Sequence, residues 1–557
     1  MTHLSLPACR TPSLLSAPAL AVLLVVPCGA FAQSAPVVDR ALAGQTVILQ
    51  RFTPPPQVGT VGLSVEDQRK RVDMAAAERI TIALKSVTVD GARTVPVQDL
   101  VPIWQNRIGT TITLADLYRM AEAVDAAYLA AGYFSKTVVP VQDFATGRIR
   151  LQVYEGYVQR VEITSDIPGI EDRLKPYIDR ILAMHPIRVK EAERVLLLMS
   201  DLGGLEIEGT FVRPEDATGG GLLKLDIGQD KRSGMIGLDN LGSEAVGPLE
   251  LSSSVTLNDM LRRFETTNLV GVVVPDDPKE LGLFQFSQDY PVGHDGLTAG
   301  FSLTYLSQHP GGSLKDQDID VTSTIGTGYL AYPILRTLDQ SLFGKAELTI
   351  RDDDVDVAGS ALSRSQTRWA TFSLEYDRLL ETGSLSAEGG VNLGVADDID
   401  MGDVPGDFRF ISASVDYLRA LGPVANLRVR AAGQFSPEPL PGAVQFALGG
   451  DPYGWAFDNG SLSGDSGAAT AVEIGRDIET RLDVMPEFTL SVFADYGTVW
   501  SQSAGIDADS LGSYGVGLGA MVADRLMVQL VGALPWTTPD SLDDPGGSVL
   551  FRIAMPF

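Results

Sequence analysis

An aspartate inside an otherwise apolar strand is the side chain of this sequence best placed to do chemistry. Residues 488–497 alternate strictly with a period of two, so Phe488 and Tyr496 fall on one face and Asp495 on the other. Phe493 and Gly497 flank the carboxylate on its own face. A carboxylate in this setting indicates a polar interior, where it can accept charge-assisted hydrogen bonds.

A second stretch, residues 445–458, is too rich in glycine and proline for a helix or a strand. It still carries three large aromatic side chains, Tyr453, Trp455 and Phe457, which a solvated loop would not normally display. The loop and the strand together predict an aqueous lumen with a loop folded into it.

No other group of side chains has the composition of a catalytic or metal centre. The histidines after residue 32 are His185, His294 and His309, one in a helical stretch and two in the strand-rich half. Gly219-Gly-Gly221 lacks the helix and the Lys-Ser/Thr ending of a phosphate loop. The acidic run 352–356 could bind a cation, although a solvated loop is the simpler interpretation. The sequence therefore predicts no enzyme activity, no cofactor and no metal.

Residues 1–32 have the pattern of a secretory signal. Arg10 precedes an apolar run over 14–26, and Ala30-Phe-Ala32 offers a cleavage site. A lipoprotein signal with Cys28 lipidated is the competing interpretation, but the proline before that cysteine fits it poorly. Both cysteines of the chain lie in this segment, so the exported chain is predicted to fold without disulfides.

The formal net charge of the chain is −28. Phosphate contacts need clustered lysine and arginine, so this charge argues against nucleic acid as a partner. No apolar run after the signal approaches the ~20 residues of a membrane helix. These two observations alone leave a soluble secreted enzyme open.

Residues 79–228 contain two tandem copies of one small α/β unit. In the first, over 79–156, the pattern predicts a helix that begins at the N-cap Thr113 and ends before Gly132. The strands expected around it are 82–89, 136–141 and 148–154. The second unit, over 157–228, has expected strands at 158–165, 205–212 and 222–227 and helices at 169–184 and 189–202.

The residues before the first unit, 33–78, are predicted to be an irregular arm. Residues 37–52 have helical potential, and Thr53-Pro-Pro-Pro-Gln57 is a stiff, extended linker. Either the arm is disordered or its helix docks elsewhere in the molecule, as a plug.

From residue 229 to 557 helical periodicity stops, and short alternating segments recur between turn-rich stretches. One face of each segment is apolar and ends in aromatics, whereas the other carries charges, hydroxyls and glycine. This pattern predicts a transmembrane antiparallel β-barrel, with lipid outside and water inside. An assumed count of about 16 strands leaves roughly 20 residues for each strand with its turn. A soluble β-sandwich is disfavoured by the number of segments and by the terminal Phe557, which resembles the C-terminal signature of outer-membrane barrels. The clearest segments are 297–305, 370–376, 427–435, 514–522 and 549–557.

Several residues of the first unit match a known pattern: a Val-x-Val-x-Gly strand, a helix ending Tyr-x-x-x-Gly-Tyr, a Gln-containing turn and a strand closing on Glu-Gly. The unit resembles the POTRA domain of two-partner secretion transporters, and the second unit resembles a POTRA domain more generally. The matching residues are Val87, Val89, Gly91, Tyr128, Gly132, Tyr133, Gln142, Gly147, Glu155 and Gly156. By this resemblance, partner recognition is expected at Tyr128, Gly132, Tyr133, Gln142, Glu155 and Gly156.

The barrel half resembles the TpsB transporters of that system. The segments that match are Asp239-Asn240 with Gly242 and Gly247, Gln434–Pro441 leading into Phe446–Gly450, and Phe493-x-Asp-x-Gly497. The resemblance implies a loop folded into the lumen, in which an arginine at the loop tip pairs with the strand aspartate. The implied loop motif is Gly449, Gly450, Tyr453, Gly454, Trp455, Phe457 and Asp458, and Phe557 is the implied barrel-targeting residue.

This chain departs from that pattern, because Trp455 stands where the family has its arginine. Either another cation neutralises Asp495, or that carboxylate is hydrated. The cations considered are Arg428, Arg430 and Arg476. The loop tip can instead be anchored by packing Tyr453 and Trp455 against Phe493.

The resemblance implies an outer-membrane translocase of a Gram-negative bacterium, with its POTRA modules in the periplasm. Its expected partners are a secreted exoprotein (adhesin, haemolysin or toxin), outer-membrane lipid and the barrel-assembly machinery, and it is expected to be a monomer. The alternatives are a barrel-assembly factor, a passive porin, and a surface enzyme, for which no nucleophile–base pair is found.

Overall fold

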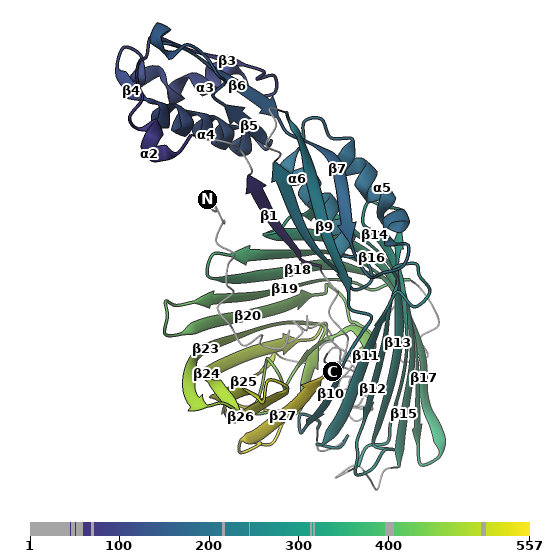
Figure 1. Cartoon of the computed structure of the whole chain (residues 1–557). Helices are drawn as coiled ribbons and strands as arrows, with labels where there is room; N and C mark the ends of the chain where they lie inside the picture. Colours follow the sequence, from purple (N-terminus) through teal and green to yellow (C-terminus); the bar gives the residue numbers. More distant parts are fainter. Residues whose placement is uncertain are drawn as a thin grey trace. The chain divides into compact units, whose positions relative to one another are not determined.

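A computed structural model describes residues 45, 51, 59–67, 72–213, 218–243, 246–311, 315, 318–395, 406–502 and 508–557. The predicted signal lies outside the described residues. The described residues form two compact units, one of 59–230 and one of 45, 51 and 231–557 (Figure 1). Among them, no helix is both long enough and apolar enough to cross a membrane.

The first module packs helix α4 (Leu114–Ala130) on a three-stranded sheet of order β3-β6-β5. The helix begins where the sequence predicts, because Thr113 and Asp116 cap each other reciprocally. The sheet strands are β3 (Ser86–Asp90), β5 (Ser135–Val138) and β6 (Arg148–Glu155). Shorter elements complete the module: α2 (Met74–Ala77), β2 (Thr81–Ala83), α3 (Val97–Leu100) and β4 (Thr111–Thr113).

Two expectations for this region are corrected. The strand expected at 82–89 is two strands in different sheets, since β2 pairs with β4 and β3 pairs with β6. The break falls at Leu84 and Lys85, whose N–H groups donate to the carbonyls of Thr110 and Gly147. In addition, Ala77 of α2 is fully buried in the core of the module, so the module begins before residue 79.

The second module contains every element that the sequence predicts: β7 (Tyr157–Thr164), α5 (Ile170–Leu182), α6 (Val189–Ser200), β8 (Leu205–Arg213) and β9 (Gly220–Gln229). Its sheet also holds a fourth strand, β1 (Val61–Asp67), in the order β1-β8-β9-β7. This strand lies within the arm that was predicted to be irregular. It runs parallel to β8, with seven consecutive residue pairs from Val61–Ile207 to Asp67–Arg213.

Backbone hydrogen bonds join the two modules. The N–H of Val189 donates to the carbonyl of Gly132, and the N–H of Ile187 donates to that of Gly156, at 3.0 and 2.8 Å. The ring of Phe134 stacks on Phe211 of β8, with centroids 5.4 Å apart. The modules therefore form a single packed body.

Sixteen strands of the described residues close an antiparallel barrel, in which β10 pairs with β27 (Figure 1). The predicted alternating segments lie in strands, except for the terminal Phe557, which follows the last strand. Their apolar faces point outward, as Leu303 and Tyr305 show with about half of each side chain exposed. The strands are β10 (Arg232–Asp239), β11 (Glu250–Asn258), β12 (Thr266–Val273), β13 (Leu281–Val292), β14 (Leu297–Gln308), β15 (Ile319–Arg336), β16 (Gln340–Val357), β17 (Ser360–Leu380), β18 (Gly383–Gly394), β19 (Arg409–Ala420), β20 (Asn426–Phe435), β23 (Ser466–Leu482), β24 (Met485–Trp500), β25 (Asp509–Val522), β26 (Leu526–Thr537) and β27 (Ser548–Pro556).

Candidate functional site

The loop between β20 and β23 is folded against the inner face of the barrel. Two short strands, β21 (Phe446–Leu448) and β22 (Leu462–Gly464), pair with each other and carry the glycine-rich tip. The tip aromatics Tyr453, Trp455 and Phe457 are all buried. They pack in one cluster with residues of the strand arc β20 and β23 to β26: Ala432, Ala469, Ala471, Val499, Leu511, Val531 and Ala533.

The loop and the strand motif fit each other side chain by side chain. The Trp455 ring packs on Phe493, with centroids 5.8 Å apart and the rings tilted by 47°. Gly497 leaves room for Leu448, because a Cβ at that glycine would lie 2.6 Å from a Leu448 methyl carbon. The aromatic anchoring considered from the sequence is therefore present at Trp455.

The loop tip needs glycine at two positions. Gly449 has a φ of +112° and Gly454 a φ of +123°. Residues with a Cβ rarely adopt these backbone conformations. A Cβ at Gly449 would also lie 2.1 Å from the carbonyl oxygen of Asp458. The turn is closed by the N–H of Gly450, which donates to the carbonyls of Gly454 and Phe457. The motif glycines thus shape the tip that presents Trp455.

Asp495 is buried on the inner face and is held by hydroxyl and amide donors. The N–H and the hydroxyl of Ser513 on β25 both donate to its carboxylate, and the backbone N–H of Trp455 faces it. Three arginines were considered as its partner. One of them, Arg476, lies next to Asp477 on β23 and so points to the opposite, outer face of the barrel. Neutral donors therefore take the place of the family's arginine.

A different ion pair joins the loop to the barrel wall in this chain, and its charges are reversed relative to the loop arginine and strand aspartate that the resemblance implies. Asp451 of the loop pairs with Arg430 of β20 at 3.2 Å, and both side chains are 12% exposed. Arg428, on the same strand, instead pairs with Asp416 of the neighbouring strand β19. The carboxylate thus lies on the loop and the cation on the barrel wall. The sequence had considered Arg430 only as a partner of Asp495.

The described residues of the arm touch the inner face of the barrel at two separate places. Arg51 pairs with Asp239 of β10 and Glu250 of β11, both at 2.8 Å, and all three side chains are under 5% exposed. Gln45 accepts hydrogen bonds from Ser323 of β15 and Arg351 of β16. Sequence reasoning missed these residues as a site. The sequence does contain a hint of this site. Two acids, Asp239 and Glu250, lie near the start of the barrel, and the arm carries an arginine that could pair with them.

The POTRA residues expected to recognise a partner lie in internal contacts. Tyr128 is fully buried and donates to Glu155, which also accepts from the N–H groups of Arg93 and Thr94. The Gln142 side-chain amide exchanges two hydrogen bonds with the backbone of Arg150. Gly132, Tyr133 and Gly156 line the joint between the modules, where Tyr133 forms a β-bridge with Arg188.

Glu155 makes the stability of the first module depend on pH. Burial would raise the pKa of its carboxyl, but the N–H groups of Thr94 and Arg93 and the Tyr128 hydroxyl hold that pKa below its usual range. A lowered folded-state pKa stabilises the fold above the unfolded value of about 4.3, and this stabilisation is lost as pH falls through the folded value. The carboxylate in turn helps to raise the pKa of Tyr128, after burial.

We therefore expect Glu155→Gln to lower the stability of the first module by about 1 kcal/mol at neutral pH. This value is below the usual range for hydrogen bonds to charged groups, because Glu155 is partly exposed. Hydrogen-exchange protection of the Arg93 and Thr94 amides in the full chain measures this loss of stability. The parent's protection should fall roughly fivefold as pH drops below the unfolded value of about 4.3 and through the folded-state pKa of Glu155, and the variant's should be lower by the same factor already at neutral pH. Glu162→Gln, on an exposed side chain, is the control and should change neither. Parent-like protection in Glu155→Gln would contradict the assignment.

Trp455→Arg tests the alignment of the loop tip. Because the 455 backbone already faces Asp495, we expect the new guanidinium to reach this carboxylate. The secretion that the resemblance implies should then be retained or improved. Trp455→Ala, which removes the ring without adding a charge, should lower secretion, since truncating a buried tryptophan costs about 3–5 kcal/mol. Complete loss of secretion with arginine would count against the alignment. Surface display of the secreted partner measures both variants.

The barrel closes through residues at both ends of its sequence. Phe557 exchanges two backbone hydrogen bonds with Gly234 of β10, both 2.9 Å long, and its ring is 63% exposed. The Asn240 side chain bonds the backbone of Val549 and Phe551, so it spans the same closure. Across the described parts of the chain, no group of three or more side chains could hold a metal ion.

Comparison with known proteins agrees with this geometry. Residues 82–156 match the ShlB-type POTRA domain. One relative is the outer membrane transporter CdiB of Escherichia coli, 22% identical over 542 residues, which are 87% of this chain and 84% of the relative. CdiB of Escherichia coli O6:K15:H31 (strain 536 / UPEC) is 23% identical over 507 residues, or 82% and 79% of the two chains.

Solved structures share the fold. CdiB from Escherichia coli superposes with a TM-score of 0.71 at 18% identity, covering 95% of this chain and all of that one. CdiB from Acinetobacter baumannii gives 0.63 at 16% identity, with the same coverage. BamA from Haemophilus ducreyi lacking POTRA domains 1–3 gives 0.54 at 13% identity, covering 86% and 100%.

A second family model matches the chain beyond its first module. Residues 223–521, more than half of the chain, match the haemolysin secretion/activation protein family ShlB/FhaC/HecB. Together with the POTRA modules and the closed barrel, this match shows that the chain belongs to that family, the TpsB-type outer-membrane transporters of two-partner secretion.

Proposed function

We propose that this transporter secretes one unfolded exoprotein of the adhesin, haemolysin or toxin type, and that it has no enzymatic activity of its own. The POTRA modules capture the exoprotein in the periplasm, and the barrel passes it outward once the loop and the arm move aside. The observation that carries this proposal is that both segments are fixed to the wall by local contacts. Among the described residues, two ion-pair sites, Arg430–Asp451 and Arg51 with Asp239 and Glu250, hold them to the wall.

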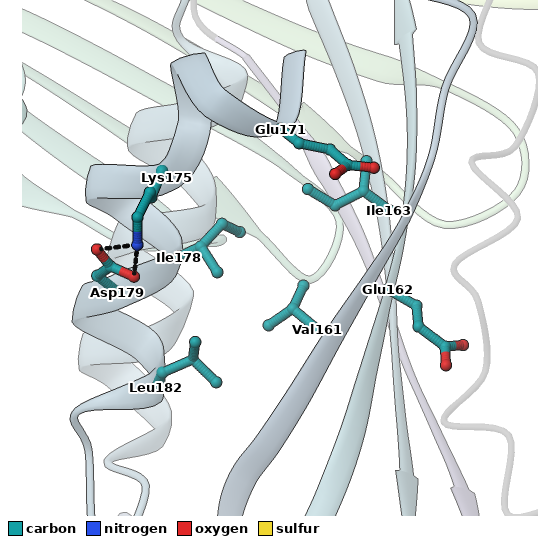
Figure 2. A pocket seen from close by; sticks show the side chains of 8 residues that line it. All are labelled: Val161, Glu162, Ile163, Glu171, Lys175, Ile178, Asp179 and Leu182. Carbon is teal, nitrogen blue, oxygen red and sulfur yellow. Dashed lines mark hydrogen bonds and ion pairs between the residues drawn. The ribbon is translucent and has the colours of Figure 1, made fainter. Parts of the chain in front are cut away.

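Capture uses strand addition, because main-chain hydrogen bonds bind an extended chain with little regard to its sequence. The second module offers two sheet edges, β1 and β7. Beside β7, a groove of about 430 Å³ lies between this strand and α5 (Figure 2). Its apolar lining is Val161, Ile163, Ile178 and Leu182, and its charged side chains are Glu162, Glu171, Lys175 and Asp179.

The remaining partners follow from the same proposal. The exposed apolar outer face of the barrel contacts outer-membrane lipid. The barrel-assembly machinery inserts the chain, with Phe557 as the recognised end. One chain closes all sixteen strands, which supports a monomer. We propose the division into a signal over 1–32, an arm, two modules up to 228 and a barrel from 229. No nucleotide site is proposed, so folding of the exoprotein outside drives its release.

The test compares the culture supernatant and surface proteins of a strain lacking this gene with those of its parent. Loss of one large exported protein is the expected result, and it identifies the partner. Loss of several outer-membrane barrels instead would indicate an assembly factor. Altered solute uptake with unchanged proteins would indicate a porin. Either of these outcomes would overturn the proposal.

A further inference from the structure

The β8 edge of the second module is already occupied by a strand of the same chain. Seven residues of β1 pair in register with β8, and the hydroxyls of Ser64 and Thr210 lie 2.9 Å apart across the pair. Upstream of the strand, the N–H of Gly59 donates to the Asp201 carboxylate at the end of α6. This edge therefore accepts an extended chain over seven of the nine residues of β8.

Side chains contribute little to holding β1 in place. Val61 is buried, but Leu63 and Val65 are each 41% exposed, and Gly62, Ser64 and Glu66 are exposed as well. Full burial of a leucine or valine side chain would stabilise the strand by about 1.5–3 kcal/mol. Leu63 and Val65 contribute only part of that, because both are partly exposed. The strand is held mainly by backbone hydrogen bonds, which any extended segment can form. It is therefore replaceable.

The opposite edge of the same sheet is a poorer acceptor. The pairing of β7 with β9 shifts register between Val158 and Arg160, a bulge of the kind that disrupts further pairing. Arg160 and Glu162 form an exposed ion pair on this strand. Bulges and charged side chains are the features by which sheet edges avoid adding strands. Of the two edges, the one beneath β1 is thus better suited to a new strand.

We propose that β8 is the capture edge for the exoprotein and that β1 is a resident strand which an extended exoprotein segment displaces. This inference rests on the proposed function and names its capture site. The chain's own strand indicates the chemistry of the incoming segment. Apolar side chains at alternate positions would take the places of Val61, Leu63 and Val65, with small or hydroxyl side chains between them. Gly209 of β8 provides the space for the middle apolar residue, since a Cβ there would lie 3.0 Å from a Leu63 methyl carbon.

A reversible cross-link tests the displacement. Both natural cysteines lie within residues 1–32, so Ser64→Cys with Thr210→Cys introduces the only pair in the exported chain. These two residues are direct partners, and a disulfide between them fixes β1 on β8. The matched control is Thr210→Cys with Lys224→Cys, which links β8 to β9, two strands that stay together in the proposal. Gel mobility before and after reduction confirms that each disulfide has formed.

We expect the β1–β8 link to lower exoprotein secretion at least tenfold, and reductant to restore it to within twofold of the parent in the same cells. The β8–β9 link should leave secretion unchanged. Restoration by reductant excludes misfolding as the cause. Parent-level secretion by the fully cross-linked β1–β8 variant would overturn the strand exchange alone, and would place capture at the β7 edge or on the outer edge of β1. If the parent itself secretes no exoprotein that depends on this chain, the proposed function fails, and the exchange fails with it.

Discussion

Replacing Arg51 with alanine is expected to open the purified transporter, raising its ion conductance in a planar lipid bilayer several-fold. The change leaves the carboxylates of Asp239 and Glu250 buried side by side, with less than 5% of either side chain exposed. Removing one partner of a buried ion pair costs about 3–5 kcal/mol. A cost of that size shifts the balance between a seated and a released arm by roughly a hundredfold or more. Arg552, 3.9 Å from Asp239, offsets part of the cost.

Two further variants separate charge from packing at this site. Arg51→Lys keeps a cation and should retain most of the closed state. Glu250→Gln in the Arg51→Ala background removes one of the two stranded charges and should recover barrel stability without closing the channel. The arm would not be anchored by Arg51 if Arg51→Ala conducted like the parent. Thermal unfolding of the detergent-solubilised full chain provides the stability readout.

The second large effect is expected at the ion pair between Arg430 and Asp451. Arg430→Asp would place two carboxylates together at a site where each native side chain is only 12% exposed. We expect this change to release the loop and to reduce secretion at least tenfold, since breaking a buried pair costs about 3–5 kcal/mol. The double variant Arg430→Asp/Asp451→Arg restores the pair with the polarity of the family, and should recover secretion to within a few-fold of the parent.

Loop release can be measured independently of secretion. A single cysteine at Ser461, in the loop, should react with a maleimide reagent faster in Arg430→Asp than in the parent, and the charge-swapped variant should reverse the increase. Arg428→Ala is the matched control, because that arginine pairs with Asp416 within the barrel wall. It should leave labelling at Ser461 unchanged. Failure of the swapped pair to restore either readout would show that Arg430 and Asp451 act separately.

The sequence predicted the barrel well, because its signal is local. Each strand must place apolar residues outside and polar residues inside, so the alternation at 297–305 or 549–557 is visible without knowledge of any neighbour. Helix α4 was equally predictable, since its cap residues Thr113 and Asp116 lie within four residues of each other. In both cases the information needed lies within the segment itself.

Other elements could not be predicted, because distant partners determine them. The segment 61–67 contains a glycine and two acids, and becomes a strand only because β8 offers its edge. The break between β2 and β3 depends on the carbonyls of Thr110 and Gly147.

The same limit applied to the candidate site. Sequence spacing identified Asp495, Trp455 and the loop glycines, and the structure brings them together. Sequence spacing could not show that Ser513 donates to Asp495 or that Arg430 pairs with Asp451, because those partners come from other segments of the chain. Spacing along one segment identifies the residues of a site, but the strand order decides their partners.

The pairing of β1 with β8 also makes the arm a tether. Val61 lies ten positions after Arg51 in the sequence, and a chain of that length reaches at most about 33–36 Å when fully extended. While β1 stays paired, an Arg51 that has left Asp239 and Glu250 remains within that radius of Val61. A tether of this length maintains an effective concentration on the order of millimolar. Once an exoprotein has passed and β1 has returned to its edge, the arm can therefore reseat without a separate source of energy.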